Sequence, residues 1–279
     1  MSRNGIKDLS ISGGGEPFLS PDIDGILDAA LDSGLRIRSI TNGNVLKEST
    51  VERLLRTFEI RFSVDTPDAE TYSKTRRTSP KMLSRTFENI SRLVKARNLG
   101  GHQLEIGATC IIGPENKEQL ERFADIMLGE LGIDHVIYKT DIYGNVKPNA
   151  ADTELVENQL KATRQKYGTR VDIRPDLGVF ISGLSCVESH FKSVINPYGE
   201  LFSCCLGAQP GETNGAKYGS VKAEIRGGNT NALTTIWRQT KDLRETMRRR
   251  VGCTNCNFTD REINGAFIDF RNNIPVIGS

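Results

Sequence analysis

Two patterns of apolar residues alternate through the first half of the chain. Short continuous apolar runs are separated by amphipathic segments with helical spacing, five times before residue 141. We expect strands at Ile6–Ser12, Leu35–Thr41, Glu59–Val64, Leu104–Ile112 and Ile133–Thr140. Strands that alternate with helices form a parallel sheet, and continuous apolar runs are typical of strands that helices cover. The pattern therefore predicts an α/β fold with crossover helices.

The pattern changes after about residue 152. A predicted helix near 153–166 is followed by two short strands, 192–195 and 200–203, which the turn Asn196–Gly199 joins as a hairpin. We expect residues 211–228, which are polar and glycine-rich, to form a loop, and residues 232–250 to form a helix. We place the boundary at 175, which gives domains 1–175 and 176–279.

Composition excludes several classes of protein. The 279 residues carry a net charge of +2, which argues weakly against bulk nucleic-acid binding. No apolar run approaches the roughly 20 residues of a membrane helix, and the N-terminus has no hydrophobic signal core. We therefore expect a cytoplasmic protein with no membrane or nucleic-acid partner, in a compartment where structural disulfides are rare.

Four of the six cysteines form a pattern that suits a metal. Cys186 and Cys204 flank the predicted hairpin, and Cys253 and Cys256 form a C-x-x-C pair. Four thiolates in this arrangement suit either tetrahedral zinc or an iron–sulfur cluster, and the spacing does not separate the two. The alternative is four unrelated core cysteines, since free cysteine is often buried.

The other two cysteines have simpler explanations. Cys110 lies inside a predicted strand, so we expect it to pack in the core. Cys205 follows Cys204 directly and points the other way on a strand, which favours packing, although an exchange of ligand roles between the two stays open.

Polar side chains and glycines follow three predicted strands. Backbone N–H groups at Gly13, Gly14 and Gly15 can approach a polar ligand closely, and the Glu16 carboxylate can hold an ammonium group. The alternative is a plain strand-to-helix turn. Ser63 and Asp65 end a strand where α/β folds place ligands, although Asp65 can instead cap the next segment. Asn42 can line the same cavity or make a turn.

These segments, in this order, resemble motifs of the radical S-adenosylmethionine (SAM) superfamily. SGGGEPFL at 12–19 resembles its G-G-E-P segment, TNG at 41–43 its T-N-G, and RFSVD at 61–65 its S-x-D strand end. The cysteine spacing, with Gly199 between Cys186 and Cys204, resembles a SPASM or Twitch domain. Because no cysteine follows Cys256, it resembles the shorter Twitch form, which has one auxiliary [4Fe–4S] cluster.

The resemblance implies a fold and a cofactor site. The fold would be a partial (β/α)6 TIM-like barrel that lacks its first strand, followed by a small cysteine-rich domain of a hairpin and helices. The glycine-rich turn would bind the methionine end of SAM, Ser63 would contact SAM, and Arg76 or Arg77 could pair with its carboxylate. The expected cofactor-binding residues are Gly13, Gly14, Gly15, Glu16, Asn42, Ser63 and Asp65, and the expected cluster ligands are Cys186, Cys204, Cys253 and Cys256.

One motif of the family does not occur in this sequence. The C-x-x-x-C-x-x-C that binds the SAM-cleaving cluster is absent, and so is the first barrel strand that precedes it. Loss of one N-terminal stretch of roughly 30–60 residues explains both absences by ordinary element lengths. A misplaced start, a gene fragment and a split gene are the explanations that stay open, and we expect this chain not to cleave SAM alone.

The resemblance implies a radical SAM iron–sulfur enzyme or its remnant. In the family a reduced [4Fe–4S] cluster cleaves SAM to a 5′-deoxyadenosyl radical that abstracts hydrogen from a substrate. An external electron donor and a small-molecule or peptide substrate would be its partners, and the auxiliary cluster would accept an electron or bind substrate. The alternatives are a non-catalytic protein with a structural zinc or iron–sulfur site, and one half of a split enzyme completed by an N-terminal fragment.

Overall fold

A computed structural model describes residues 5–13, 15–140, 150–174, 192–204, 208 and 217–244 of the chain. The chain divides into two compact units, Met1–Leu177 and Gly178–Ser279. No helix of the described residues is long and apolar enough to cross a membrane.

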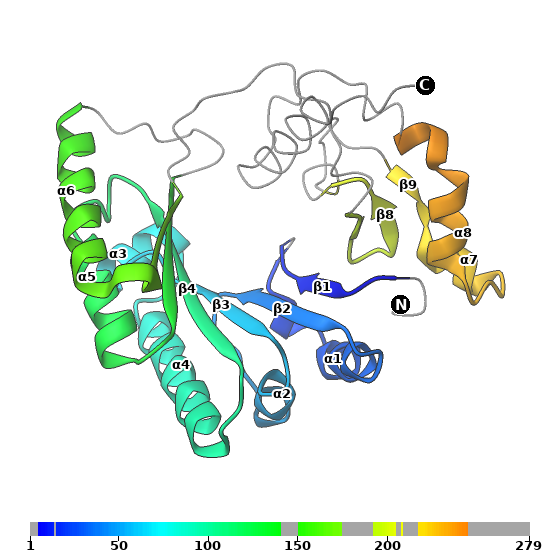
Figure 1. Cartoon of the computed structure of the whole chain (residues 1–279), viewed down its shortest axis with the longest axis horizontal. Coiled ribbons are helices and arrows are strands. Elements are labelled where there is room, and N and C mark those ends of the chain that lie inside the picture. The colour runs from blue at the N-terminus through cyan, green and yellow to red at the C-terminus, as the bar shows by residue number, and fades with distance from the viewer. Residues whose placement is uncertain are drawn as a thin grey trace, which may run out of the picture. The chain divides into compact units, whose positions relative to one another are not determined.

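The first unit contains a parallel sheet of six strands whose spatial order follows their order in the chain (Figure 1). The strands are β1 (Asp8–Ile11), β2 (Arg36–Thr41), β3 (Glu59–Ser63), β4 (Glu105–Ile112), β5 (His135–Thr140) and β6 (Val171–Arg174). The helical segments are η2 (Pro17–Leu19), α1 (Ile23–Asp32), α2 (Glu48–Leu54), α3 (Ala69–Arg76), α4 (Lys81–Gly100), α5 (Leu120–Ala124), η3 (Asp125–Glu130), α6 (Ala150–Tyr167) and η4 (Gly168–Arg170). The predicted parallel α/β fold is confirmed.

The prediction of five strands was wrong, because β6 pairs in parallel with β5 at the edge of the sheet. The sequence of this strand is VDIR, in which polar and apolar residues alternate. β2 (RIRSIT) and β3 (EIRFS) alternate in the same way, but β6 has only four residues, which is too short for the period to be recognised.

Helices cover one face of this sheet (Figure 1). Ile60 and Phe62 of β3 are fully buried on the covered face, and α4 contributes Leu83, Ile90 and Leu93 to the same core. Their spacing places these three leucine and isoleucine side chains on one side of the helix. The core therefore lies between the sheet and its helices.

The opposite face of the sheet is charged. Glu59 of β3 lies at its centre, where it pairs with Arg38 at 3.2 Å, with Arg61 at 3.1 Å and with His135 at 3.5 Å. His135 also lies 3.2 Å from Glu105. Glu59 is 8% exposed, so one buried carboxylate joins residues of β2, β3 and β5 on this face.

We expect the stability of the first unit to fall at acidic pH through Glu59. Burial alone would raise the pKa of Glu59, but the hydrogen bond from His135 and the charges of Arg61 and Arg38 hold that pKa below 4.5. A carboxyl whose pKa is lowered by folding stabilises the fold above its unfolded pKa and loses that contribution as pH falls through the folded pKa.

Urea unfolding of the wild type and of Glu59→Gln, at about pH 7 and about pH 3.5, tests this expectation. The difference in free energy of unfolding between the two proteins should narrow as the pH falls. An equal difference at both pH values would contradict it.

The described part of the second unit is a small sheet with two helices. The antiparallel strands β7 (Val194–Ile195), β8 (Glu200–Phe202) and β9 (Lys217–Ser220) are followed by α7 (Val221–Arg226) and α8 (Ala232–Gln239). The predicted hairpin is present: the Gly199 amide donates to the Asn196 carbonyl at 2.9 Å, and Gly199 has a φ of +78°. Leu201, Tyr218 and Ile236 form the core of the described part of the second unit.

The prediction of a loop at 211–228 was wrong for its second half, where β9 and α7 lie. The short strand KYGS contributes one buried residue, Tyr218, which packs edge-to-face on Trp237 with ring centroids 6.1 Å apart. One aromatic among polar neighbours carries no periodicity, so the sequence pattern did not indicate a strand. Residues 245–250 of the predicted long helix lie outside the described residues.

Candidate functional site

Glu16 connects the turn after β1 to the end of β2. Its carboxylate accepts hydrogen bonds from the Thr41 hydroxyl and the Asn42 backbone amide, both at 2.7 Å, and from the Phe18 amide at 3.1 Å. These two strand ends lie at the carboxyl edge of the parallel sheet, where α/β folds bind ligands. Glu16 therefore fixes the position of the glycine-rich turn over that edge.

The glycine-rich turn is open to solvent. Gly13 and Gly15 have φ values of +75° and +144°, and both are exposed. A Cβ added at either position would meet no atom within 4 Å, so glycine is required by the backbone conformation rather than by crowding. Gly14 lies outside the described residues. This backbone can therefore approach a polar ligand closely.

Asn42 makes the turn after β2. Its side-chain oxygen accepts a hydrogen bond from the Asn44 amide at 2.8 Å, and the Gly43 amide donates to the Thr41 hydroxyl at 3.0 Å. Side-chain acceptors of this kind stabilise turns. The turn-forming alternative for Asn42 is therefore the one the structure supports.

Ser63 ends β3 and is half-buried. Its hydroxyl makes no hydrogen bond within the part of the chain that the structure describes, so it can still donate to and accept from a ligand.

Asp65 lies in a tight turn just beyond Ser63. Its φ is +67°, and the Thr66 amide donates to the Val64 carbonyl at 2.9 Å, which closes a γ-turn. One carboxylate oxygen lies 2.5 Å from Arg76 Nη2, and the other accepts from the Ile111 amide at 2.9 Å. Burial raises the pKa of Asp65, against the opposing effects of Arg76 and this amide.

Arg76 therefore has a partner within the protein, and Asp65 joins β3, α3 and β4 rather than only capping one segment. Arg77 follows at the end of α3 with a φ of +50° and is exposed. Of the two arginines considered for a ligand carboxylate, Arg77 is thus the one without an ion pair among the described residues.

The sequence analysis did not single out Asn116, which is 2% exposed. Its amide nitrogen donates to the Asp65 carbonyl at 2.7 Å and to the Ile111 carbonyl at 2.9 Å, and its oxygen accepts from the Gly113 amide at 2.7 Å. Asn116 thereby fixes the loop after β4 against the Asp65 turn. An isolated asparagine after a strand reads as an ordinary turn residue, so the sequence held no signal for this role.

Cys110 packs in the core, as predicted, where its thiol donates to the Asp65 carbonyl at 3.1 Å. Burial raises the pKa of this thiol well above its ordinary value. Of the expected cluster ligands, only Cys204 is described, half-buried just after β8. Cys186, Cys253 and Cys256, like Cys205, lie outside the described residues. Among residues that are described, no three His, Cys, Asp or Glu side chains could hold a metal ion.

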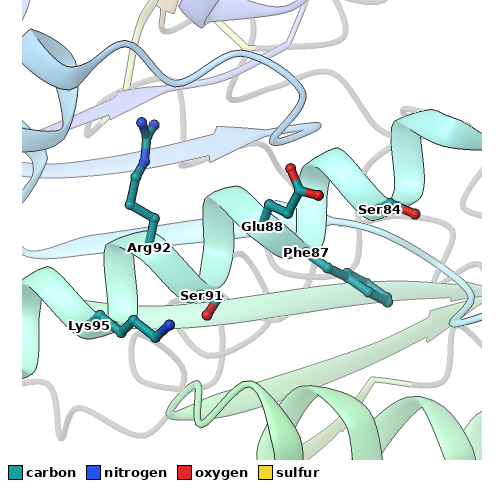
Figure 2. Close-up of a pocket in the computed structure, with 6 residues that line it drawn as sticks. All are labelled: Ser84, Phe87, Glu88, Ser91, Arg92 and Lys95. Carbon is teal, nitrogen blue, oxygen red and sulfur yellow. The ribbon is translucent and has the colours of Figure 1, made fainter.

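A surface hollow of about 620 Å³ lies elsewhere, along α4. Its lining residues are Ser84, Phe87, Glu88, Ser91, Arg92 and Lys95, all on this one helix (Figure 2). Arg92 pairs with Glu48 at 3.3 Å and donates to the Leu46 carbonyl, so it stabilises the segment around α2. This hollow contains none of the strand-end residues described above.

The first three strands of this parallel sheet end in a glycine-rich turn, an asparagine turn and a Ser-x-Asp turn, which together form the candidate site of an α/β domain. The family model of the radical SAM superfamily matches residues 1–127, the part of the chain that contains these three turns. The expected partial-barrel fold is confirmed by its likeness to solved structures.

Known proteins resemble different parts of the chain. The AdoMet-dependent heme synthase of Methanosarcina barkeri is 38% identical over 92 residues, which are 32% of this chain and 26% of the synthase. The crystal structure of Streptococcus suis SuiB bound to the precursor peptide SuiA has a TM-score of 0.62 at 18% identity, over 87% of this chain and 56% of SuiB. SuiB bound to S-adenosylmethionine has a TM-score of 0.55, over 76% of this chain and 52% of SuiB. The chain thus spans about a quarter of the synthase and about half of SuiB.

Proposed function

We propose that this chain acts in a radical SAM iron–sulfur enzyme that abstracts hydrogen from its substrate and carries one auxiliary [4Fe–4S] cluster. The single observation that carries this proposal is the Glu16 carboxylate, which holds the glycine-rich turn of β1 against the end of β2 within the matched segment. An external electron donor, a small-molecule or peptide substrate and a cytoplasmic location complete the proposal.

The residues at this edge fit the methionine end of SAM. Open backbone at Gly13 and Gly15 supplies carbonyl oxygens that can accept from an ammonium group and N–H groups that can donate to a carboxylate. The Ser63 hydroxyl is available at the end of β3. When bound, SAM and a reduced cluster supply the radical chemistry, while these residues bind and orient the cofactor.

The proposal of an auxiliary cluster rests on the spacing of the cysteines. Cys186, Cys204, Cys253 and Cys256 would be its four thiolate ligands. Cys204 follows β8 of the hairpin, as a ligand of a cluster next to that hairpin would.

Replacing Glu16 with alanine should weaken SAM binding by on the order of tenfold or more, because three hydrogen bonds to one carboxylate fix the binding turn. Equilibrium dialysis of the full chain with labelled SAM measures the dissociation constant, and circular dichroism checks that the variant is folded. Glu48→Ala is the matched control, since the Glu48 side chain is 74% exposed on α2. Wild-type protein that binds no SAM, or a Glu16→Ala variant that binds as tightly as wild type, would refute the proposal.

Anaerobic reconstitution should give about four iron and four sulfide per chain if four thiolates hold one cubane cluster. The substitution Cys253→Ala should lower both contents, whereas Cys110→Ala should not, because Cys110 is buried in the core. Iron, sulfide and zinc analysis of the same samples makes the measurement. One zinc per chain without sulfide would instead support the non-catalytic alternative.

A further inference from the structure

Three cations lie on the charged face of the six-stranded sheet. Lys139 of β5 and Arg174 of β6 are direct neighbours in the strand register. Arg61 of β3 pairs in register with Gly107, which in turn pairs with His135 of β5. Because side chains alternate along a strand, Arg61, Lys139 and Arg174 all point away from the helices. The His135 imidazole lies over Gly107, since a Cβ at this glycine would clash with His135 Nε2.

Carboxylates neutralise this cluster only in part. Arg174 lies 2.5 Å from Asp172, and Arg61 shares Glu59 with Arg38 and His135. Lys139 makes no ion pair with any residue in the described ranges. Counted over the residues that the structure describes, the face around Lys139 therefore carries an excess of positive charge.

This excess is costly where the cations are shielded from water. The Arg61 side chain is only 15% exposed. Burial and the charges of Arg61 and Arg174 lower the pKa of Lys139, against the opposing charge of Asp172. Burial with the charge of Arg174 lowers the pKa of Arg61, against the opposing charges of Glu59 and Asp172. Mutual repulsion of this kind is relieved when an anion binds, and perturbed cations cluster at functional sites.

Two of the three cations lie away from the strand ends proposed to bind SAM. Lys139 and Arg174 lie at the carboxyl ends of β5 and β6, the end at which parallel sheets bind ligands. The glycine-rich turn follows β1, at the other edge of the sheet in the strand order. A molecule held by Lys139 and Arg174 can thus lie away from the glycine-rich turn, while Arg61 lies on β3, two residues before Ser63.

We propose that Arg61, Lys139 and Arg174 bind an anionic group, a carboxylate or a phosphate, of the substrate. This inference rests on the proposed function, since it assigns the cluster to that enzyme's substrate. A guanidinium group can bind two oxygens of such an anion at once, and the Lys139 ammonium, next to Arg174 in the strand register, adds a point charge.

Trace acetylation of the full-length wild-type chain with acetic anhydride tests the proposal, with the rate at each lysine followed by mass spectrometry. The probes are inorganic phosphate and succinate, each compared with chloride at equal ionic strength. At ten times its dissociation constant, a probe should slow acetylation of Lys139 about elevenfold and leave the exposed Lys95 of α4 unchanged. Protection by phosphate alone or by succinate alone identifies the anion class.

Equal protection of Lys139 and Lys95 from acetylation would overturn the proposal, and so would the absence of protection at Lys139. Protection of Lys139 by SAM but by neither probe would also overturn it. In calorimetry, the affinity for the protecting probe should fall at least tenfold in Lys139→Gln and stay unchanged in Lys95→Gln. An unchanged affinity in Lys139→Gln would refute the site. The measurements with phosphate and succinate need no SAM, so a chain that binds SAM but neither probe refutes only this inference.

Discussion

Gly43→Ala is expected to lower the free energy of unfolding of the first unit by about 3 kcal/mol or more, the sum of left-handed backbone strain and overpacking. Gly43 has a φ of +76°, which L-residues rarely adopt. A Cβ at this position would lie 2.7 Å from Phe62 Cδ1 and 2.9 Å from Thr86 Cγ2. Phe62 and Thr86 are both fully buried, so neither can move aside without disturbing the core.

Gly101→Ala is the matched control for the backbone part of this effect. Gly101 ends α4 with a φ of +62°, and a Cβ there would meet nothing within 4 Å. It should therefore cost only the left-handed conformation, about 1–2 kcal/mol. Urea unfolding of both variants measures the difference, and equal losses would show that the space around Gly43 is not the limiting factor.

Asp65→Ala is expected to cost about 3 kcal/mol of unfolding free energy, because it leaves the partly buried Arg76 guanidinium without its partner. It also leaves the Ile111 amide without its acceptor. Asp65→Asn should cost less than half as much, because an asparagine oxygen can still accept from Ile111 and asparagine tolerates a positive φ.

A double-mutant cycle with Arg76→Ala isolates the pair. The double variant Asp65→Ala with Arg76→Ala should be more stable than the sum of the two single losses predicts, since no unpaired charge remains in it. Strict additivity of the two losses would contradict a direct Asp65–Arg76 interaction. Chemical unfolding of all four proteins at neutral pH provides the measurement.

The spacing of apolar residues was sufficient to predict the strands that are buried against helices. In β3 (EIRFS) polar residues alternate with the fully buried Ile60 and Phe62, and an alternation of that kind can be recognised without a structure. The strands β6 and β9 were missed because they are short and polar, and their pairing with β5 and β8 determines their conformation. Tertiary pairing of this kind leaves no local pattern.

The strand-end residues of the candidate site were found because each follows a strand directly. Their partners were not, since contacts such as Asp65 with Arg76, or Asn116 with the Asp65 carbonyl, depend on how the loops after β3 and β4 fold over each other. The charge of the sheet's open face was missed for a different reason. Arg61 and Lys139 occupy alternate positions in strands that were interpreted as continuous apolar runs.

The hydrogen bonds of Glu16 have a consequence for the edge of the sheet. β1 has only β2 as a neighbour among the described strands, and Glu16 is the side chain that joins the turn after β1 to the end of β2. Local opening of β1 and release of its turn are therefore one event. A ligand held by that turn would slow amide hydrogen exchange along β1 as well as at the turn itself, so occupancy of the turn and order of the edge strand are thermodynamically linked.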